Sequence, residues 1–298
     1  MPPDNPLDPE EIPYFFDNWC SLPWSPWIPF TADKHTFKEI PHDPGLYRIR
    51  PVGKDFLMYI GETRRPLHQR LSDLRMELKN RELMPWSDPH AESPGLFAWR
   101  DAEAYEYECS AAPLDASNGS RRGMETFLLY RYRQERGESP FCNFGRFHPR
   151  YRKSTERKGG LRGGKLTDGQ QDNPAGWPSH PPLGAGGKPG ESDWMGLEWS
   201  DRKPLTEENT RAVAPGAGLY LLTNAKNEVV TLGQSADCAK RLLGECRKEW
   251  EGRELRFSYQ IIGQMVLPHN LKELETDLIG NFFEMYRKAP EFQYREST

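Results

Sequence analysis

The stretch that decides the fold runs from residue 44 to 63 and reads PGLYRIRPVGKDFLMYIGET. Two short runs rich in β-branched and aromatic residues, LYRIR and FLMYI, stand on either side of a VGKD turn, a pattern that predicts a β-hairpin. The chain that follows predicts a helix, because Leu67, Leu71, Leu74 and Leu78 are spaced to fall on one helical face.

A second helix is predicted further along the same half of the chain. Ser120 can cap its start, and the pattern then runs through Glu125 and stops near Gly137, before Pro140. A hairpin, a helix, a long middle region and a second helix together predict a small α/β (α+β) unit with a mainly antiparallel sheet and flanking helices.

The second half of the chain repeats this pattern. The hairpin sequence is matched by AGLYLLTNAKNEVVTLGQS at 217–235, and the helix sequence METFLLYRYRQERGESPFCN at 124–143 is matched by LETDLIGNFFEMYRKAPEFQ at 274–293. Trp19 and Trp24 recur 175 positions later as Trp194 and Trp199. We expect these tryptophans to pack on the sheet of each repeat rather than to stack on a DNA base. The fold class is therefore two repeats of one unit.

Four regions follow from these patterns. We expect a Trp/Pro-rich arm at 1–35, a first folded domain at 36–150 and a degenerate copy of it at 192–298. Residues 151–191 are basic and then Gly/Pro-rich, with almost no apolar side chains. Such a segment cannot form a core of its own, so it is either a linker or a segment draped over a domain or a ligand.

Composition limits the classes of protein that need to be considered. The chain has 298 residues, 36% of them hydrophobic and 28% charged, and a formal net charge of -4. No stretch approaches the roughly 18 apolar residues that a membrane span needs. The acidic, proline-rich start is unlike a secretory signal, and the five cysteines show no zinc-ligand spacing. These features predict a cytoplasmic protein without a membrane partner.

The polar residues around the hairpin carry a resemblance to a known family. GLY at 45–47 and YIG at 59–61 are followed in order by Arg70, Glu125 and Asn143. This pattern resembles the GIY-YIG nuclease superfamily over roughly residues 44 to 143, about a third of the chain. Taken alone, each residue has a structural explanation, since strand tyrosines usually pack and helix charges are usually solvated. The ordered combination favours an active site.

The resemblance implies a metal-dependent DNA endonuclease that hydrolyses phosphodiester bonds. Tyr47 would act as the general base and Tyr59 would position water or phosphate, while Arg70 would bind a phosphate through its fork of donors. Glu125 would hold one Mg²⁺ or Mn²⁺, and Asn143 would support the site by hydrogen bonding. Because a tyrosine has a solution pKa near 10, a nearby metal or guanidinium would have to favour the phenolate of Tyr47.

A basic segment begins directly after Asn143. Residues 146–165 contain eight arginines and lysines against a single acid, Glu156. Clustered cations beside a phosphodiester site favour contact with a DNA backbone, whereas a solvated linker is the alternative. The candidate DNA-binding residues are Arg146, Arg150, Arg152, Lys153, Arg157, Lys158 and Arg162.

The second repeat departs from the family pattern. Tyr220, Arg241 and Glu275 stand where Tyr47, Arg70 and Glu125 stand in the first repeat, but Thr231 and Gln293 replace the second tyrosine and the asparagine. We expect this copy to be inactive or weak and to contribute DNA contacts or packing. One intact site per chain means that cutting both strands needs a homodimer or two successive nicks.

The 55 positions between Arg70 and Glu125 leave room for inserted target-reading elements such as PWSDPHAESPGLFAWRD. This favours a restriction or defence endonuclease. Two alternatives stay open: a structure-specific DNA repair or recombination nuclease, and a non-catalytic DNA-binding scaffold protein.

Overall fold

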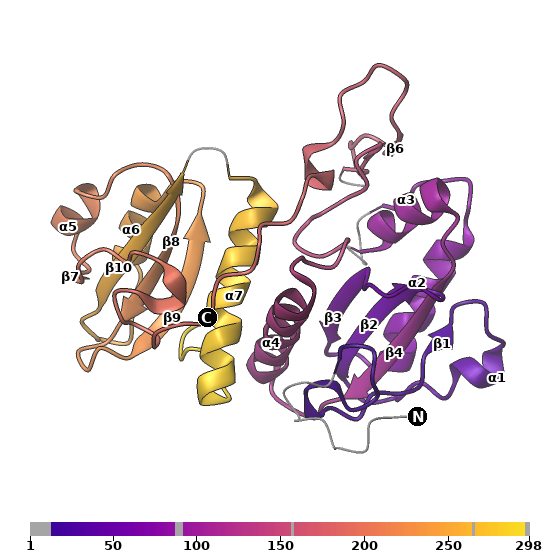
Figure 1. The fold of residues 1–298 in the computed structure, drawn as a ribbon, viewed down its shortest axis with the longest axis horizontal. Coiled ribbons are helices and arrows are strands. Elements are labelled where there is room, and N and C mark those ends of the chain that lie inside the picture. The colour runs from indigo at the N-terminus through magenta and orange to yellow at the C-terminus, as the bar shows by residue number, and fades with distance from the viewer. Residues whose placement is uncertain (1–12, 87–91, 156–157, 264–265, 296–298) are drawn as a thin grey trace. The chain divides into compact units, whose positions relative to one another are not determined.

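A computed structural model describes residues 13–86, 92–155, 158–263 and 266–295. The chain divides into two compact units (Figure 1). The first unit comprises Met1–Arg121 and Ser139–Pro178, and the second comprises Arg122–Glu138 and Ser179–Thr298. The described part of each unit contains a four-stranded antiparallel sheet packed with helices.

The first sheet is built on the predicted hairpin. Its strands, in the order in which they lie side by side, are β1 (Ile28–Pro29), β4 (Tyr107–Pro113), β2 (Gly45–Pro51) and β3 (Tyr59–Thr63). Every neighbouring pair is antiparallel, and β2 is hydrogen-bonded on both edges. All but one of the β2 residues are buried, and they include Arg48, whose side chain donates to the Phe16 carbonyl over 2.9 Å.

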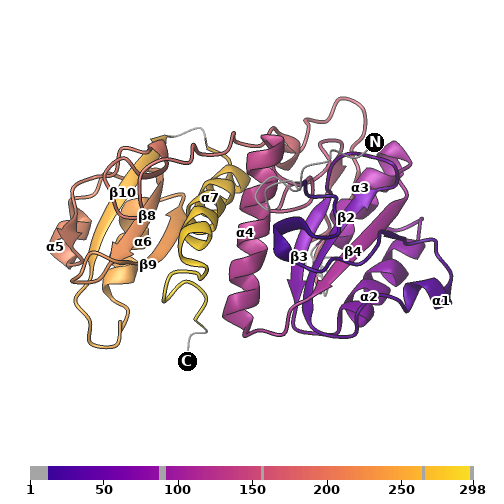
Figure 2. The same cartoon turned by 60° about the horizontal axis from the view of Figure 1, so that its bottom comes forward.

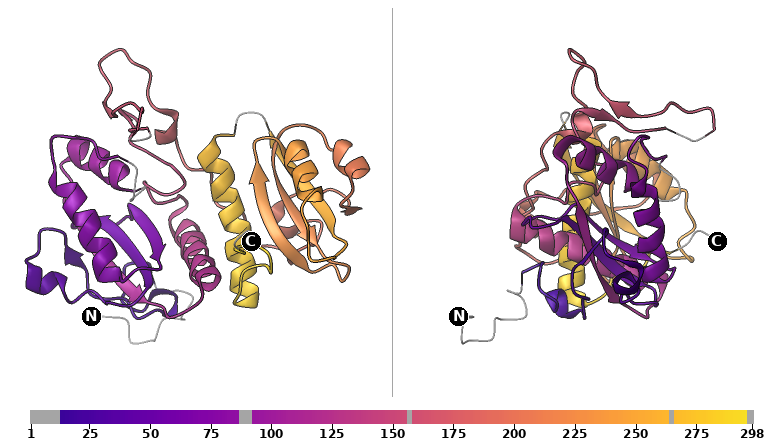
Figure 3. Two further views of the ribbon diagram at one scale, coloured as in Figure 1. Left: turned by 180° about the vertical axis from the view of Figure 1, so that it is seen from behind. Right: turned by 90° about the vertical axis from the view of Figure 1, so that its right-hand side faces the viewer.

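The helix predicted after the hairpin is confirmed as α2 (Leu67–Lys79), and its four stripe leucines are buried. It contacts β2, β4 and α3 (Ser93–Glu103), and a short helix, α1 (Lys34–Phe37), lies in the chain between β1 and β2 (Figure 3). Leu96 and Phe97 of α3 are buried in the core of the first unit. Most of the described part of the expected target-reading insertion is therefore core structure.

Residues 151–155 and 158–178, expected as part of a linker or draped segment, belong to the first unit. Tyr151 is buried in its core and donates a hydrogen bond to Asp101, and the Phe147 amide donates to the Ala175 carbonyl over 3.0 Å. Among the described residues of this segment, regular structure is limited to the short pair β5 (Tyr151–Arg152) and β6 (Gly164–Lys165) and a 3-10 turn at Pro174–Gly176.

The second sheet has a corresponding strand order. Its strands are β7 (Lys203–Pro204), β10 (Arg256–Gly263), β8 (Ala217–Thr223) and β9 (Val229–Ser235). The helices of this part of the chain are α5 (Glu207–Arg211), α6 (Cys238–Cys246) and α7 (Pro268–Tyr286). Both α6 and α7 contact β8 and β9 (Figure 2).

The tryptophan motif has the same local structure in both units. Each motif forms a 3-10 turn, at Trp19–Ser21 and at Trp194–Gly196. The indole N–H of Trp24 donates to the Trp19 carbonyl over 3.0 Å, and that of Trp199 donates to the Trp194 carbonyl over 3.1 Å. All four side chains are buried, as the packing interpretation predicted.

The helix that carries Glu125, α4 (Asn118–Arg136), was expected in the first domain, but from Arg122 onward it belongs to the second unit. Buried contacts with α7 account for this: Phe127 stacks on Phe283 at 5.3 Å, and Arg133 pairs with Asp277 at 2.7 Å.

The prediction that Ser120 caps α4 is wrong. The helix begins at Asn118, and the Ser117 hydroxyl accepts a hydrogen bond from the Ser120 amide over 3.2 Å, which is the usual capping contact. The predicted end is confirmed, because α4 stops at Arg136 and Gly137 follows with a φ of 75°. Over the described parts of the chain, no helix combines the length and the apolar character needed to cross a membrane.

Candidate active site

The hairpin brings two phenols together on one face of the first sheet. Tyr47 pairs with Gly61 and Ile49 pairs with Tyr59 in the β2–β3 register. The rings of Tyr47 and Tyr59 lie with centroids 5.9 Å apart. A Cβ atom at Gly61 would lie 2.5 Å from the Tyr59 ring and 2.8 Å from the Tyr47 ring. The glycine of the YIG motif therefore leaves the space that the two phenols fill.

Helix α2 adds a cation to the phenols. The Arg70 Nε–H donates to the Tyr47 hydroxyl over 3.2 Å, and the guanidinium carbon lies 5.9 Å from the centre of the Tyr47 ring. Arg70 is offset from the buried leucine stripe, as predicted, and its side chain keeps 15% of its surface exposed. The sequence pattern thus gathers two tyrosines and an arginine at one place.

The site contains a carboxylate that sequence reasoning missed. Glu92 directly precedes α3, and its side chain is fully buried. The Tyr47 hydroxyl donates to Glu92 Oε1 over 2.8 Å, while Arg70 Nη2 donates to the two carboxylate oxygens over 2.8 and 3.1 Å. The sequence offers one indication of such a residue: an arginine beside a core needs an anionic partner. No spacing rule selects Glu92 among the acidic residues nearby.

Burial and charge keep Tyr47 protonated at neutral pH. Burial is the main reason that the pKa of Tyr47 lies well above its ordinary value, and the neighbouring charge of Glu92 raises it further. Arg70 acts in the opposite direction but is outweighed. We expected that a nearby metal or guanidinium would have to favour the Tyr47 phenolate, and the guanidinium of Arg70 does not achieve this. Burial lowers the pKa of Arg70, but Tyr47 and Glu92 more than offset this, so Arg70 stays charged.

Asn143 supports the hairpin rather than a ligand. Its side-chain oxygen accepts from the Ile60 amide over 3.0 Å, and its Nδ2 donates to the Ile60 carbonyl over 2.8 Å. Asn143 is buried, and Ile60 is the residue between Tyr59 and Gly61. The amide therefore closes the open edge of β3 at the motif itself.

We expect Asn143→Ala to lower the free energy of unfolding of the first unit by about 2–3 kcal/mol, because it leaves a buried backbone N–H and C=O without their partner. Urea unfolding followed by tyrosine and tryptophan fluorescence measures this change. Asn118→Ala, at the start of α4, provides a control of the same chemical type. An Asn143→Ala midpoint equal to that of the wild type would show that water replaces the amide at no cost.

Glu125, the predicted metal ligand, is described with the second unit. There, Glu125 and Glu275 both act on Tyr294. Burial is the main reason that the pKa of Tyr294 is raised, and the charges of the two carboxylates raise it further. The structure thus brings Tyr47, Tyr59 and Arg70 together in the first unit, with Asn143 supporting them. Within the described ranges, no group of three or more His, Cys, Asp or Glu side chains could hold a metal ion.

The second unit contains a matching Tyr–Arg–Glu arrangement. Arg241 Nε donates to the Tyr220 hydroxyl over 3.1 Å, and that hydroxyl donates to Glu245 Oε1 over 3.1 Å. Arg241 pairs with the same carboxylate oxygen at 3.1 Å. Here the carboxylate comes from α6 itself, four residues after the arginine, and the side chain of Arg241 is 51% exposed.

One reason for expecting an inactive second copy does not hold. The Gln293 side chain accepts from the Leu232 amide over 2.8 Å and donates to the Leu232 carbonyl over 3.0 Å, which is the same pair of bonds that Asn143 makes. The second phenol is still replaced by Thr231. Burial raises the pKa of Glu275 to about 7, with Arg241 and Lys272 acting against it.

The basic segment after Asn143 is divided between interior and surface. Arg146 is buried and donates to the Ser139 carbonyl over 2.6 Å, and Arg150 pairs with Asp172 at 2.8 Å. Arg162 lies 4.7 Å from the centre of the Trp86 ring, and Lys153 is half-buried. Arg152 and Lys158 are exposed, whereas Arg157 lies outside the described residues.

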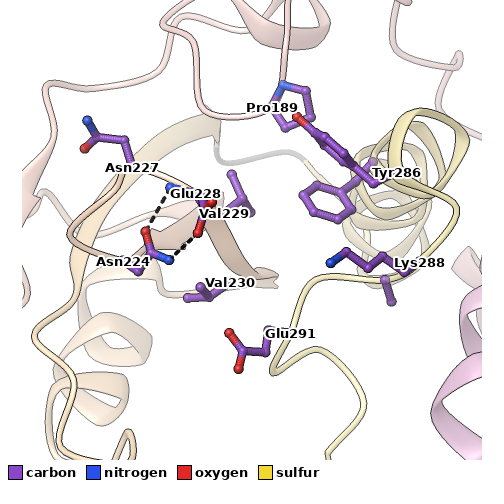
Figure 4. Close-up of a pocket in the computed structure, with 11 residues that line it drawn as sticks. Pro189, Asn224, Asn227, Glu228, Val229, Val230, Tyr286, Lys288 and Glu291 are labelled. Atoms are coloured by element: carbon purple, nitrogen blue, oxygen red, sulfur yellow. Dashed lines mark hydrogen bonds between the residues drawn. The ribbon is translucent and has the colours of Figure 1, made fainter.

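A cavity of about 480 Å³ lies elsewhere, in the second unit (Figure 4). It is bordered by the β8–β9 turn, by β9 and by the end of α7 with the residues that follow. Figure 4 shows Tyr286 and Lys288 on one side and Asn224 and Asn227 on the other. Its lining includes none of Tyr220, Arg241 and Glu275.

Comparisons of the chain with models of protein families, with curated proteins and with solved structures gave no significant match.

Proposed function

We propose that the chain is a metal-dependent DNA endonuclease that hydrolyses phosphodiester bonds at the β2–β3 hairpin of the first unit. The observation that carries this proposal is the convergence of Tyr47, Tyr59 and Arg70 on one face of the sheet. These are three of the polar positions on which the resemblance to the GIY-YIG superfamily rests. Two phenols and a guanidinium supply hydrogen-bond donors and positive charge for a phosphate.

Arg70 is oriented for binding an anion. Its Nε and Nη2 atoms are committed to Tyr47 and Glu92, while Nη1 takes part in none of these bonds. We assign Nη1 to an oxygen of the scissile phosphate. Tyr59, which is half-buried, would position the attacking water or the phosphate from the same face.

The proposed cofactor is Mg²⁺ or Mn²⁺. Carboxylate oxygens suit these ions, and the family resemblance assigns Glu125 as the protein ligand, with waters and the substrate phosphate as the remaining ligands. When bound, the ion offsets charge on the phosphoryl oxygens and lowers the pKa of bound water. The exposed cations Arg152 and Lys158 are the best candidates for contact with the DNA backbone.

A specific observation favours one alternative, a DNA-binding scaffold without catalysis. Tyr47 is completely buried and Glu92 holds both Tyr47 and Arg70, a geometry that a purely structural network also explains. A restriction or defence role and a repair or recombination role differ in substrate. A restriction or defence enzyme requires a particular base sequence or base modification in unbranched duplex DNA. A repair or recombination nuclease requires branched DNA.

The test uses the full chain with supercoiled plasmid and Mg²⁺ or Mn²⁺. Wild type, Glu125→Ala and Glu275→Ala are run side by side on modified and unmodified plasmid and on a branched duplex. We expect plasmid cleavage by wild type and by Glu275→Ala, and at least a 100-fold slower reaction by Glu125→Ala. Loss of cleavage only in Glu275→Ala would assign the metal ligand to the degenerate copy of the motif, and DNA binding without cleavage by wild type would favour the scaffold.

A further inference from the structure

We propose that Glu92 is a positioning residue of this site: it fixes Arg70 and accepts the Tyr47 proton when Tyr47 takes one from the attacking water. The proposal rests on the proposed function and deepens it. Glu92 is outside the motif that carries the family resemblance, and it enters the site from the loop before α3.

The contacts of Glu92 define its geometry. One carboxylate oxygen accepts from both the Tyr47 hydroxyl and Arg70 Nη2, each over 2.8 Å, and the other accepts from Nη2 over 3.1 Å. These bonds hold two edges of the guanidinium and leave Nη1 for an anion. If Arg70 tilted away from this position, Nη1 would move and the hydrogen bond from Nε to Tyr47 would break at the same time. The Glu92 carboxylate therefore positions both Arg70 and Tyr47.

The direction of the Tyr47 hydrogen bond supports a role in proton transfer. The phenol donates its proton to Glu92 and accepts one hydrogen bond from Arg70, so one lone pair of its oxygen remains for a further proton. Burial disfavours a free phenolate at this position. If Tyr47 passes its own proton on while it receives one from water, it never carries the negative charge of a phenolate. Glu92 lies within hydrogen-bond distance of the Tyr47 hydroxyl and can accept that proton.

A water O–H bond breaks and its proton goes to the Tyr47 oxygen, while the original Tyr47 proton goes to Glu92. The water oxygen forms a bond to phosphorus, the bond from phosphorus to the leaving oxygen breaks, and the leaving oxygen takes a proton from solvent. After the product leaves, Glu92 returns its proton to Tyr47, and Tyr47 passes the proton taken from the attacking water to a water that enters the site, which restores the starting state without any oxidant or reductant.

The second unit shows that a Tyr–Arg pair can also hold a carboxylate supplied by a different element, since Glu245 comes from α6 itself. A structural role alone would explain this recurrence. The experiment therefore needs a readout that a structural role does not change, which is the catalytic rate of folded protein and its pH dependence.

Glu92→Gln keeps the size and most hydrogen bonds of the side chain but removes its charge and its ability to accept the proton. We expect kcat on plasmid to fall about 100-fold, the range for a lost base, with KM changing much less. Glu92→Asp should recover part of the loss. Adding Tyr47→Phe to Glu92→Gln should cost little more, because the two residues act as one unit.

The matched control is Glu108→Gln. Glu108 is also buried in the first unit and pairs with Arg50 at 2.6 Å, outside the proposed site. It should leave kcat unchanged even if the protein is less stable. Circular dichroism establishes that each variant is folded.

If folded Glu92→Gln has the kcat of the wild type, the proposal is overturned. If Arg70→Ala is inactive in the same series, the proposed function still stands. If Glu92→Gln fails to fold, Glu92→Asp decides: the acidic limb of its kcat–pH profile should shift, and an unchanged limb overturns the proposal. Absence of cleavage by wild type itself refutes the proposed function and this inference with it.

Discussion

Replacing Arg70 by alanine should slow DNA cleavage by about 10²- to 10³-fold, the usual cost of removing one donor that stabilises transition-state charge. Arg70 is the residue that links the phenols to an anionic substrate, because its Nε reaches Tyr47 and its Nη1 is not used by Tyr47 or Glu92. The measurement is the single-turnover rate on plasmid with Mg²⁺, together with the dissociation constant for the same DNA.

Arg241→Ala provides the control for Arg70→Ala. Arg241 makes the corresponding contact with Tyr220 in the second unit. There, a threonine stands at the position that corresponds to Tyr59. We expect the cleavage rate of Arg241→Ala to stay within about threefold of the wild-type rate. If instead Arg241→Ala is inactive and Arg70→Ala cleaves normally, the two units have the opposite roles.

Arg133→Ala should lower the free energy of unfolding of the second unit by about 3–5 kcal/mol, the cost of leaving buried charge without its partner. Arg133 is fully buried on α4 and donates to the two oxygens of Asp277 over 2.7 and 2.9 Å. Glu273, also fully buried, lies 3.8 Å from the same guanidinium. Without Arg133, α7 would hold two buried carboxyl groups facing a cavity.

A neighbouring arginine supplies the control for this stability change. Arg131 lies on the same helix and pairs with Glu284 at 2.9 Å, but both side chains are partly exposed. Arg131→Ala should therefore cost only about 1 kcal/mol or less. Urea unfolding of the full-length proteins measures both changes. An Arg133→Ala midpoint no lower than that of Arg131→Ala would mean that the buried pair contributes no more than an exposed one.

The local elements were predictable because their signals are local. The hairpin at 45–63 follows from two runs of β-branched and aromatic residues around a turn, the helix at 67–79 follows from the leucine stripe, and the structure has both. The approach of Tyr47 and Tyr59 also follows, since strand pairing around a short turn limits which side chains can meet. These features depend on residues close in sequence.

The features that were missed depend on contacts between distant residues. Glu92 meets Tyr47 across 45 positions, and no periodicity connects a loop acid to a strand tyrosine. The pattern of α4 predicted a helix but not its partner, because an amphipathic face shows that something is buried and not which unit covers it. Likewise, Arg146 was predicted to contact DNA from the surface, but its side chain is buried and donates to the Ser139 carbonyl.

The most direct test of the central claim is the fate of supercoiled plasmid incubated with the purified full-length protein in Mg²⁺, in EDTA, and in Mg²⁺ with the Tyr47→Phe/Arg70→Ala double variant. We expect nicked or linear DNA only for wild type in Mg²⁺. Equal cleavage by the double variant, or intact plasmid in every reaction despite DNA binding, would contradict it.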